Sequence, residues 1–196
     1  MRIGVFGGTF DPVHLAHLVL AEQCREQARL DRVLFIPAAR PPHKLTRPLT
    51  PFHHRAEMLR LAVAGYPPFQ VSEVEHDRPG PSYTADTLRE LRQQHPGDEF
   101  FLLIGSDTLA ELPTWYQPEA IVAQATLLVV VRPDHPLPAQ GPFPYQPVQT
   151  PLLAIASRDL RRRVAEGRTI RYLVPRAVEC YIATHRLYQP AGDPSA

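Results

Sequence analysis

Five short apolar runs, rich in β-branched and aromatic residues, recur along the chain. They cover residues 2–6, 32–37, 69–74, 100–105 and 126–132. Two of them contain the sequences FFLLI and LLVVV, which are apolar at every position instead of alternating. This pattern is typical of parallel strands that helices cover on both faces. The runs therefore predict the buried strands of one parallel sheet.

Longer stretches with helical periodicity separate these runs. They cover residues 14–29, 51–65 and 84–94, followed near the end of the chain by a helix from residue 158 and another over 175–185. Asp11, Thr50 and either Ser82 or Thr84 stand where the first three helices would begin, and these residue types commonly cap helix N-termini. The alternation of strands with helices predicts an α/β fold.

Prolines gather in one segment of the chain. Seven of the nineteen residues from Pro133 to Pro151 are proline, and we expect a structureless connector there, with a last short strand over 152–156. The 23 prolines and 10 glycines are too few among 196 residues for a disordered chain, in which they reach about 25–30%. With 44% hydrophobic residues, the chain is expected to form a single domain over 1–188 and a flexible tail over 189–196.

Charge and cysteine content narrow the class of protein. The 21 basic and 20 acidic residues give a net charge of +1, which argues against a broadly electrostatic nucleic-acid or membrane binder. Cys24 and Cys180 lie far apart within predicted helices, so neither a disulfide framework nor a cysteine metal site is expected. The longest apolar run is too short to cross a bilayer. We therefore expect a cytoplasmic protein.

The first predicted strand runs directly into the segment GGTFDPVHLAH. Gly7 and Gly8 allow a sharp turn and a close ligand approach at the carboxyl end of the strand, where open α/β sheets bind ligands. His14 and His17 share one face of the first helical turn, where backbone N–H groups favour an anion. Two imidazoles in this position predict a site for phosphate groups.

Two other interpretations of this segment stay open. The glycines can form a tight turn whose histidines only cap or pack the helix. A zinc site is the other, although neither histidine has the glutamate neighbour of an H-E-x-x-H motif and the chain offers no clear third ligand. The glycine spacing matches neither the G-x-G-x-x-G fingerprint nor a Walker A loop.

This segment resembles the signature of the nucleotidyltransferase superfamily with an HxGH motif, with Ala16 where the motif has glycine. Members of the superfamily transfer a nucleotidyl group from a nucleoside triphosphate. Their second signature, ISSTxxR, resembles IASRDLR at residues 155–161: Ser157 and Arg161 match, whereas Ala156 and Arg158 replace hydroxyl residues. The resemblance implies a Rossmann-like parallel sheet with helices on both faces.

Four further segments resemble one family of this superfamily, the bacterial nicotinate mononucleotide adenylyltransferases. They are IPAARPPHK at 36–44, PSYTADTL at 81–88, IGSD at 104–107 and LPTWY at 112–116. With the two signatures they cover the chain from Arg2 to about Tyr188. The resemblance implies transfer of the adenylyl group of ATP to nicotinate mononucleotide in NAD biosynthesis, with pyrophosphate released and Mg²⁺ accompanying ATP.

The resemblance also implies a role for individual residues. The catalytic set is His14, His17, Lys44 and Arg161. The ATP-binding set is Gly7, Gly8, Thr9, Phe10, His17, Asp107, Ser157 and Arg161. The set that binds nicotinate mononucleotide is His43, Lys44, Thr84, Trp115, Tyr116 and Arg132.

Several of these roles also make chemical sense without the family. Trp115 is the only tryptophan, and its flat indole suits stacking on a pyridine ring, with a core anchor as the alternative. N–H groups at the helix start near Thr84 can hold a carboxylate and would disfavour an amide. Asp107 suits a ribose contact or a helix N-cap, and Lys44 a phosphate contact or the surface.

Alternatives to this function are another acceptor, such as phosphopantetheine or nicotinamide mononucleotide, and a nucleotide sensor that has lost catalysis. The sensor is suggested by Ala16, Ala156 and Arg158, which depart from the motifs. Assembly into a homo-oligomer is compatible with the sequence, and neither a nucleic-acid nor a membrane partner is expected.

Overall fold

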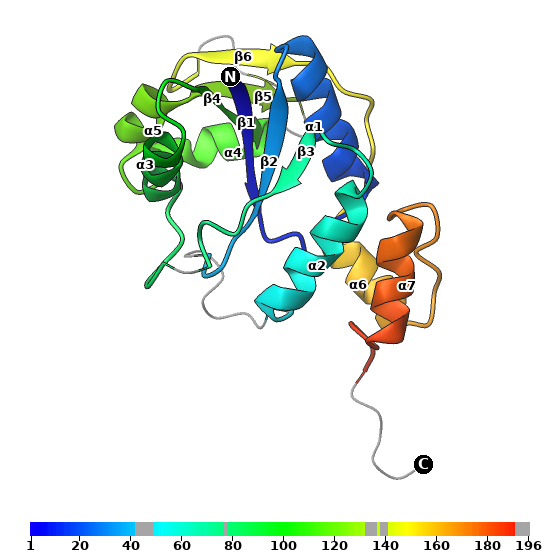
Figure 1. Cartoon of the computed structure of the whole chain (residues 1–196). Helices are drawn as coiled ribbons and strands as arrows, with labels where there is room; N and C mark the ends of the chain where they lie inside the picture. Colours follow the sequence, from blue (N-terminus) through cyan, green and yellow to red (C-terminus); the bar gives the residue numbers. More distant parts are fainter. Residues whose placement is uncertain (42–48, 77, 132–136, 138–140, 191–196) are drawn as a thin grey trace.

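The structure is a computed structural model that describes residues 1–41, 49–76, 78–131, 137 and 141–190 (Figure 1). Within these ranges six strands form one sheet in the order β3-β2-β1-β4-β5-β6, and every pair of neighbours is parallel. The strands are β1 (Arg2–Gly8), β2 (Arg32–Pro37), β3 (Phe69–Val71), β4 (Glu99–Gly105), β5 (Thr126–Val130) and β6 (Tyr145–Val148). The five predicted strands are confirmed, with boundaries shifted by a few residues.

Helices cover both faces of the sheet, which confirms the predicted Rossmann-like α/β class (Figure 1). One face packs against α1 (Leu15–Gln27), α2 (Phe52–Val63), α6 (Ser157–Ala165) and α7 (Arg176–Thr184). The other packs against α3 (Thr84–Gln94), α4 (Ser106–Glu111) and α5 (Pro118–Gln124). Alternate residues of each strand point to opposite faces, so Phe101 and Leu103 enter the first core and Leu102 and Ile104 the second.

The strand order reverses beside β1, and this reversal determines where the sheet can bind a ligand. The chain runs outward from β1 to β2 and β3, then returns to add β4 on the other side of β1. Open parallel sheets bind ligands outside the carboxyl ends of the strands at such a reversal. The loop after β1, which leads to His14, and the start of α4, which carries Asp107, therefore lie at this reversal.

The expectation of a structureless connector from Pro133 to Pro151 is wrong at residues 145–148, which form β6 beside β5. An edge strand tolerates Pro147 because only one of its sides forms ladder hydrogen bonds. Gln149 is held by the side chain of Gln27 through two hydrogen bonds, of 2.7 and 3.1 Å. The strand expected over 152–156 is absent from the described chain, where these residues adopt no regular structure.

The predicted helix caps are also wrong. The residues that precede α1, α2 and α3 are His14, Pro51 and Tyr83. The Asp11 carboxylate instead accepts hydrogen bonds from the hydroxyl of Tyr188 and the N–H of Thr50. No predicted element corresponds to α4, the 3₁₀ helix η2 (Leu112–Thr114) or α5. None of the helices in the described ranges has the length and apolar character needed to cross a membrane.

Candidate active site

The loop after β1 is anchored by the buried ring of Phe10. Phe10 is 2% exposed, and its ring packs against those of Phe6, Phe35 and His17 with centroid separations of 5.4, 5.8 and 5.1 Å. A Cβ atom on Gly8 would lie 3.1 Å from this ring, so the close approach favours glycine there. The side chain of Phe10 is thus part of the core, and a ligand can meet only its backbone.

The two motif histidines form a stacked pair at the start of α1. Their ring centroids lie 3.6 Å apart with an angle of 19° between the planes. The backbone N–H of His14 donates to Nδ1 of His17 at 3.2 Å. Because Nδ1 of His17 accepts this bond, the proton of the neutral ring lies on Nε2, which becomes a hydrogen-bond donor. This is the tautomer that a phosphate ligand requires.

Part of the hydrogen-bonding capacity at the start of α1 is used inside the protein. The N–H of Leu15 donates to the carbonyl of Leu173 at 3.0 Å, and the N–H of His17 to the carbonyl of His14 at 3.0 Å. The first turn contains no acidic residue, so the positive end of the helix dipole is not neutralised from within the helix. An anion is therefore favoured there, with the imidazoles supplying donors.

The two signature segments, far apart in sequence, meet at this loop. The hydroxyl of Ser157, the first residue of α6, donates to the carbonyl of Pro12 at 2.9 Å. Nη1 of Arg161 donates to the carbonyl of Asp11 at 2.7 Å. A hydroxyl has one proton to donate, so a phosphate contact from Ser157 would compete with the bond to Pro12, whereas Arg161 has five N–H donors. Both residues hold the loop that leads to the histidines.

A second set of predicted residues meets across α3 and η2. Thr84 is the first residue of α3, and the preceding Tyr83 packs its ring on that of Tyr116 at a centroid separation of 4.5 Å. Trp115 follows η2 and is half-buried against the core on that face, so the core-anchor interpretation holds for part of its ring. Tyr116 is 46% exposed. The segments around Thr84 and Tyr116 thus lie together.

Other candidates are placed differently. Asp107 lies inside the first turn of α4, whose N-cap is Gly105, so the N-cap interpretation of Asp107 is wrong. His43, Lys44 and Arg132 lie outside the described residues. Within the described ranges, no group of three or more His, Cys, Asp or Glu side chains could hold a metal ion, so a zinc site around His14 and His17 gains no third ligand there.

Arg55 is a buried residue that contacts the loops of the site, and no sequence motif predicted a role for it. The residue is 2% exposed, and its guanidinium donates to backbone carbonyls of the loops that follow β1 and β2. A sequence signal does exist, because Arg55 falls on the same helical stripe as the buried Met58, Leu59 and Val63. A basic residue on the apolar stripe of a helix needs internal acceptors, and here the site loops supply them.

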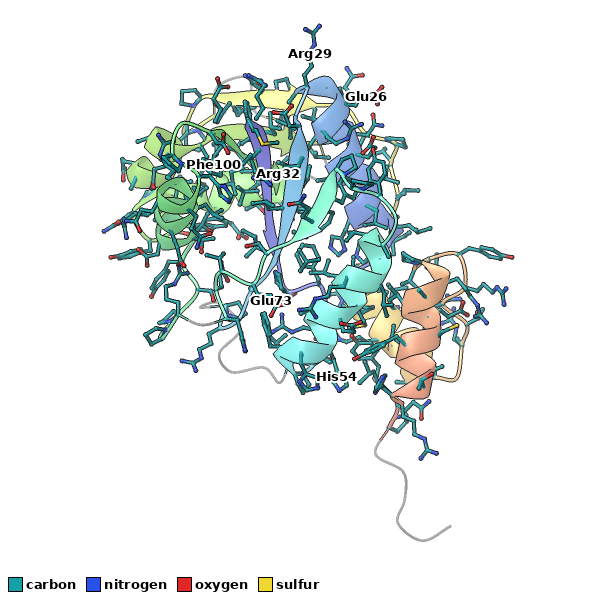
Figure 2. The ribbon with its side chains drawn as sticks, viewed as in Figure 1. Glu26, Arg29, Arg32, His54, Glu73 and Phe100 are labelled. Carbon is teal, nitrogen blue, oxygen red and sulfur yellow. The ribbon has the colours of Figure 1, made fainter. Side chains whose placement is uncertain are left out.

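A cluster of histidines lies outside the site, between α2 and α7. His54, in the first turn of α2 (Figure 2), has its ring 4.1 Å from that of His53 and 5.2 Å from that of His185. Nδ1 of His54 is hydrogen-bonded to the hydroxyl of Tyr181 at 2.9 Å. Burial lowers the pKa of His54 below its ordinary value, and the neighbouring His53 and His185 lower it further. His54 is therefore neutral in the folded protein near neutral pH.

This shift predicts a pH dependence of stability. The unfolded chain binds a proton on His54 below about pH 6.5, whereas the folded protein binds it only at lower pH. Neutral His54 therefore costs the folded protein no stability above about pH 6.5. As the pH falls from there toward the folded-state pKa of His54, the free energy of unfolding decreases. We expect the Tm of His54→Gln to fall less than that of the unchanged protein between about pH 7 and 5. Thermal denaturation at several pH values measures this. An equal fall in Tm for the two proteins between about pH 7 and 5 would contradict the lowered pKa of His54.

Comparison with known proteins gives consistent matches over the whole chain. The cytidylyltransferase-like family model matches residues 5–163. A protein of Thermus thermophilus, named probable nicotinate-nucleotide adenylyltransferase, is 53% identical over 189 residues, which cover 96% of this chain and all of the relative. A protein of Geobacter sulfurreducens with the same name is 44% identical over 216 residues, covering 98% of this chain and all of that relative.

Solved structures support the fold at lower identity. The nicotinic acid mononucleotide adenylyltransferase of Plasmodium falciparum complexed with NaAD has a TM-score of 0.81 at 20% identity, over 95% of this chain and 97% of that one. The same enzyme complexed with APC has a TM-score of 0.79 over 95% and 96%. These similarities extend over almost the whole of each chain.

Proposed function

Because the chain belongs to the nicotinate-nucleotide adenylyltransferases of the cytidylyltransferase-like family, we propose that it transfers the adenylyl group of ATP to nicotinate mononucleotide. The products are nicotinate adenine dinucleotide and pyrophosphate, and the reaction belongs to NAD biosynthesis. The observation that carries the proposal is the meeting of the two signature segments, where Ser157 and Arg161 bind the loop that leads to His14 and His17.

The reaction needs no protein nucleophile. A 5′-phosphate oxygen of nicotinate mononucleotide attacks the α-phosphorus of ATP in line, and the bond to the pyrophosphate oxygen breaks. Such chemistry is catalysed mainly by positioning and by stabilising charge on the phosphate oxygens. The Nε2–H of His17 donates to these oxygens, with His14 beside it. Arg161 retains donors for the departing pyrophosphate, and Lys44 is assigned to align the two anions.

We propose Mg²⁺ as the cation that accompanies ATP, and the donor set fits this arrangement. The described site presents imidazole and guanidinium donors to an anion and no cluster of carboxylates that would hold a cation by itself. A cation of this kind usually arrives on the substrate phosphates with few protein ligands. Bound in that way, it offsets part of the polyphosphate charge.

The acceptor pocket is assigned to the segments around Thr84 and Tyr116. Backbone N–H groups at these positions are proposed to bind the nicotinate carboxylate, while Trp115 stacks on the pyridine ring. The NH₂ group of nicotinamide would oppose N–H donors, so nicotinamide mononucleotide is disfavoured. We assign His43 and Arg132 to the same substrate on the family pattern. We propose that the reaction takes place in the cytoplasm on small-molecule substrates, and a homo-oligomer is compatible with it.

Because Trp115 is the only tryptophan, its fluorescence reports on this pocket directly. We expect nicotinate mononucleotide to quench the emission saturably, since a stacked pyridine ring replaces solvent at the indole. Nicotinamide mononucleotide should need a concentration about tenfold higher or more, because an opposed polar pair costs about 1–3 kcal/mol. A fluorescence titration measures both, with ribose 5-phosphate as a control ligand that lacks the ring. Equal quenching by the two mononucleotides would contradict the assigned carboxylate pocket.

A further inference from the structure

Arg55 joins the loops on the two sides of the proposed site. Its Nε donates to the carbonyl of Thr50 at 2.8 Å, and its Nη1 donates to the carbonyls of Thr9 and Ala38, both at 2.9 Å. Thr9 belongs to the loop after β1 that leads to the histidines. Ala38 and Thr50 stand on either side of the segment that contains Lys44 in the sequence. One buried side chain therefore connects the ATP-side loop with both flanks of that segment.

Asp11 reinforces the connection from the opposite side. Asp11 is 3% exposed, and its carboxylate accepts from the N–H of Thr50 at 3.3 Å and from the hydroxyl of Tyr188 at 2.7 Å. Thr50 is thus held at both of its backbone groups, by Asp11 at the N–H and by Arg55 at the carbonyl. Burial and the negative charge of Asp11 raise the pKa of Tyr188, so its hydroxyl remains protonated and donates.

The bond from Tyr188 brings the last described segment of the chain to the site. Residues 11 and 188 lie at opposite ends of the sequence, and Tyr188 reaches Asp11 from beyond α7. The Asp11 backbone is held as well, because Arg161 donates to its carbonyl. Arg55 and Tyr188 therefore hold Thr9 and Asp11 in the segment that leads into the motif histidines, and we call Arg55, Asp11 and Tyr188 the Arg55 network.

Stability alone is a poor explanation for the Arg55 network. Because the charged guanidinium of Arg55 is buried and desolvated, its pKa is lowered, and the nearby Asp11 opposes that effect. Buried charges contribute little net stability compared with apolar side chains of similar volume. They do hold backbone groups in a fixed geometry, because each lost hydrogen bond would leave a buried polar group without a partner.

We propose that the Arg55 network is a positioning unit that fixes the loop bearing His14 and His17 relative to Ala38 and Thr50. The inference rests on the proposed function, which assigns Lys44, between Ala38 and Thr50 in the sequence, and the loop bearing His14 and His17 to the two phosphate-bearing substrates. In-line transfer depends on the relative placement of the reacting groups, so a small shift between the segments lowers turnover. The network residues touch neither substrate, and their contribution is to geometry.

Tyr188→Phe tests the unit with the smallest change, because it removes one hydroxyl and keeps the ring. We expect kcat for nicotinate adenine dinucleotide formation to fall about tenfold at a temperature well below Tm, since a hydrogen bond to a charged group is lost. The KM values for both substrates should change by less than about threefold. Tyr66→Phe is the matched control, because the Tyr66 hydroxyl donates to the Glu22 carboxylate at 2.9 Å away from the site, and its kcat should be unchanged.

Arg55→Lys keeps the charge but replaces a planar group that reaches three carbonyls with a single ammonium. We expect its kcat to fall at least as far as that of Tyr188→Phe. Arg60→Lys is the control on the same helix, where the Arg60 side chain is 49% exposed and pairs with Glu57 at 3.0 Å. Hydrogen exchange of the backbone amides of residues 9–17 should be faster in both network variants and unchanged in both controls.

The outcomes separate this proposal from the proposed function. Turnover by the unchanged protein tests the function, and the ratio of variant to unchanged kcat tests the network. A Tyr188→Phe variant with a lower Tm but normal kcat and normal exchange over residues 9–17 would overturn the inference, because its role would then be structural. Should Arg55→Lys fail to fold, Tyr188→Phe still decides. Should the unchanged protein not turn over, the exchange measurement still tests whether the network holds the loop.

Discussion

His17→Ala is expected to lower kcat by about 10²–10³-fold while the fold survives, because it removes a donor that acts mainly in the transition state. The structure sharpens the reason. Nδ1 of His17 is occupied by the N–H of His14, so the proton is directed to Nε2, where the phosphate oxygens are assigned to lie. The methyl group of alanine supplies neither function. Steady-state kinetics with both substrates saturating would measure the effect.

The control for this variant is His95→Ala, which removes an imidazole from the C-terminal end of α3, away from the β1 loop. Its kcat should equal that of the unchanged protein. His17→Gln is expected to lie between the two, because an amide can accept from the N–H of His14 and donate on its other side. Near-normal turnover of His17→Ala, with unchanged circular dichroism, would remove His17 from the catalytic set.

Arg161→Met is expected to lower kcat/KM for ATP by about 10²-fold, because a charged hydrogen bond to the departing pyrophosphate is lost. Arg161 also donates to the carbonyl of Asp11 at 2.7 Å, so the Tm should fall by a few degrees as the loop loses one anchor. Methionine keeps most of the length of the side chain without its donors. Initial rates at varied ATP and thermal denaturation would measure the two effects separately.

The adjacent Arg162 provides a matched control on the same helix. Its side chain is 64% exposed and pairs with Asp159 at 3.0 Å, on a face turned about 100° from Arg161. Arg162→Met should leave kcat/KM for ATP unchanged. Equal losses in Arg161→Met and Arg162→Met would indicate a general effect of positive charge on nucleotide binding and would contradict a specific role for Arg161.

The sheet was largely predictable because its central strands are apolar at every position. Phe100 to Ile104 and Leu127 to Val130 are buried from both sides, and such runs leave no other interpretation at that length. Strand β6 could not be predicted in this way, because it contains Pro147 and the polar Gln146, and only its last residue, Val148, is buried. The strand forms because it pairs with the edge of β5. This tertiary contact leaves no periodic pattern in the sequence.

The motif residues were predictable for a different reason. His14, His17, Ser157 and Arg161 stand at fixed spacings within recognisable segments, and the structure brings those segments together at the β1 loop. Their individual roles in catalysis remain predictions. The structure adds that Ser157 and Arg161 hold the β1 loop through its backbone carbonyls.

The buried network around Arg55 could not be derived from local patterns. Asp11 is of a residue type that commonly caps helices. Its carboxylate instead accepts hydrogen bonds from Tyr188 and Thr50, and His14 is the N-cap of α1. The contact with Tyr188 joins opposite ends of the chain, which no short-range rule anticipates. Long-range hydrogen bonds of buried polar groups therefore account for most of what the sequence patterns missed at this site.

The central claim is that this chain catalyses adenylyl transfer to nicotinate mononucleotide. It is tested most directly by mixing the protein with ATP, Mg²⁺ and nicotinate mononucleotide and measuring pyrophosphate together with the dinucleotide product. We predict equal amounts of pyrophosphate and nicotinate adenine dinucleotide, formed over many turnovers. Binding of ATP without pyrophosphate release would contradict the claim and would favour a nucleotide sensor, the alternative suggested by Ala16, Ala156 and Arg158.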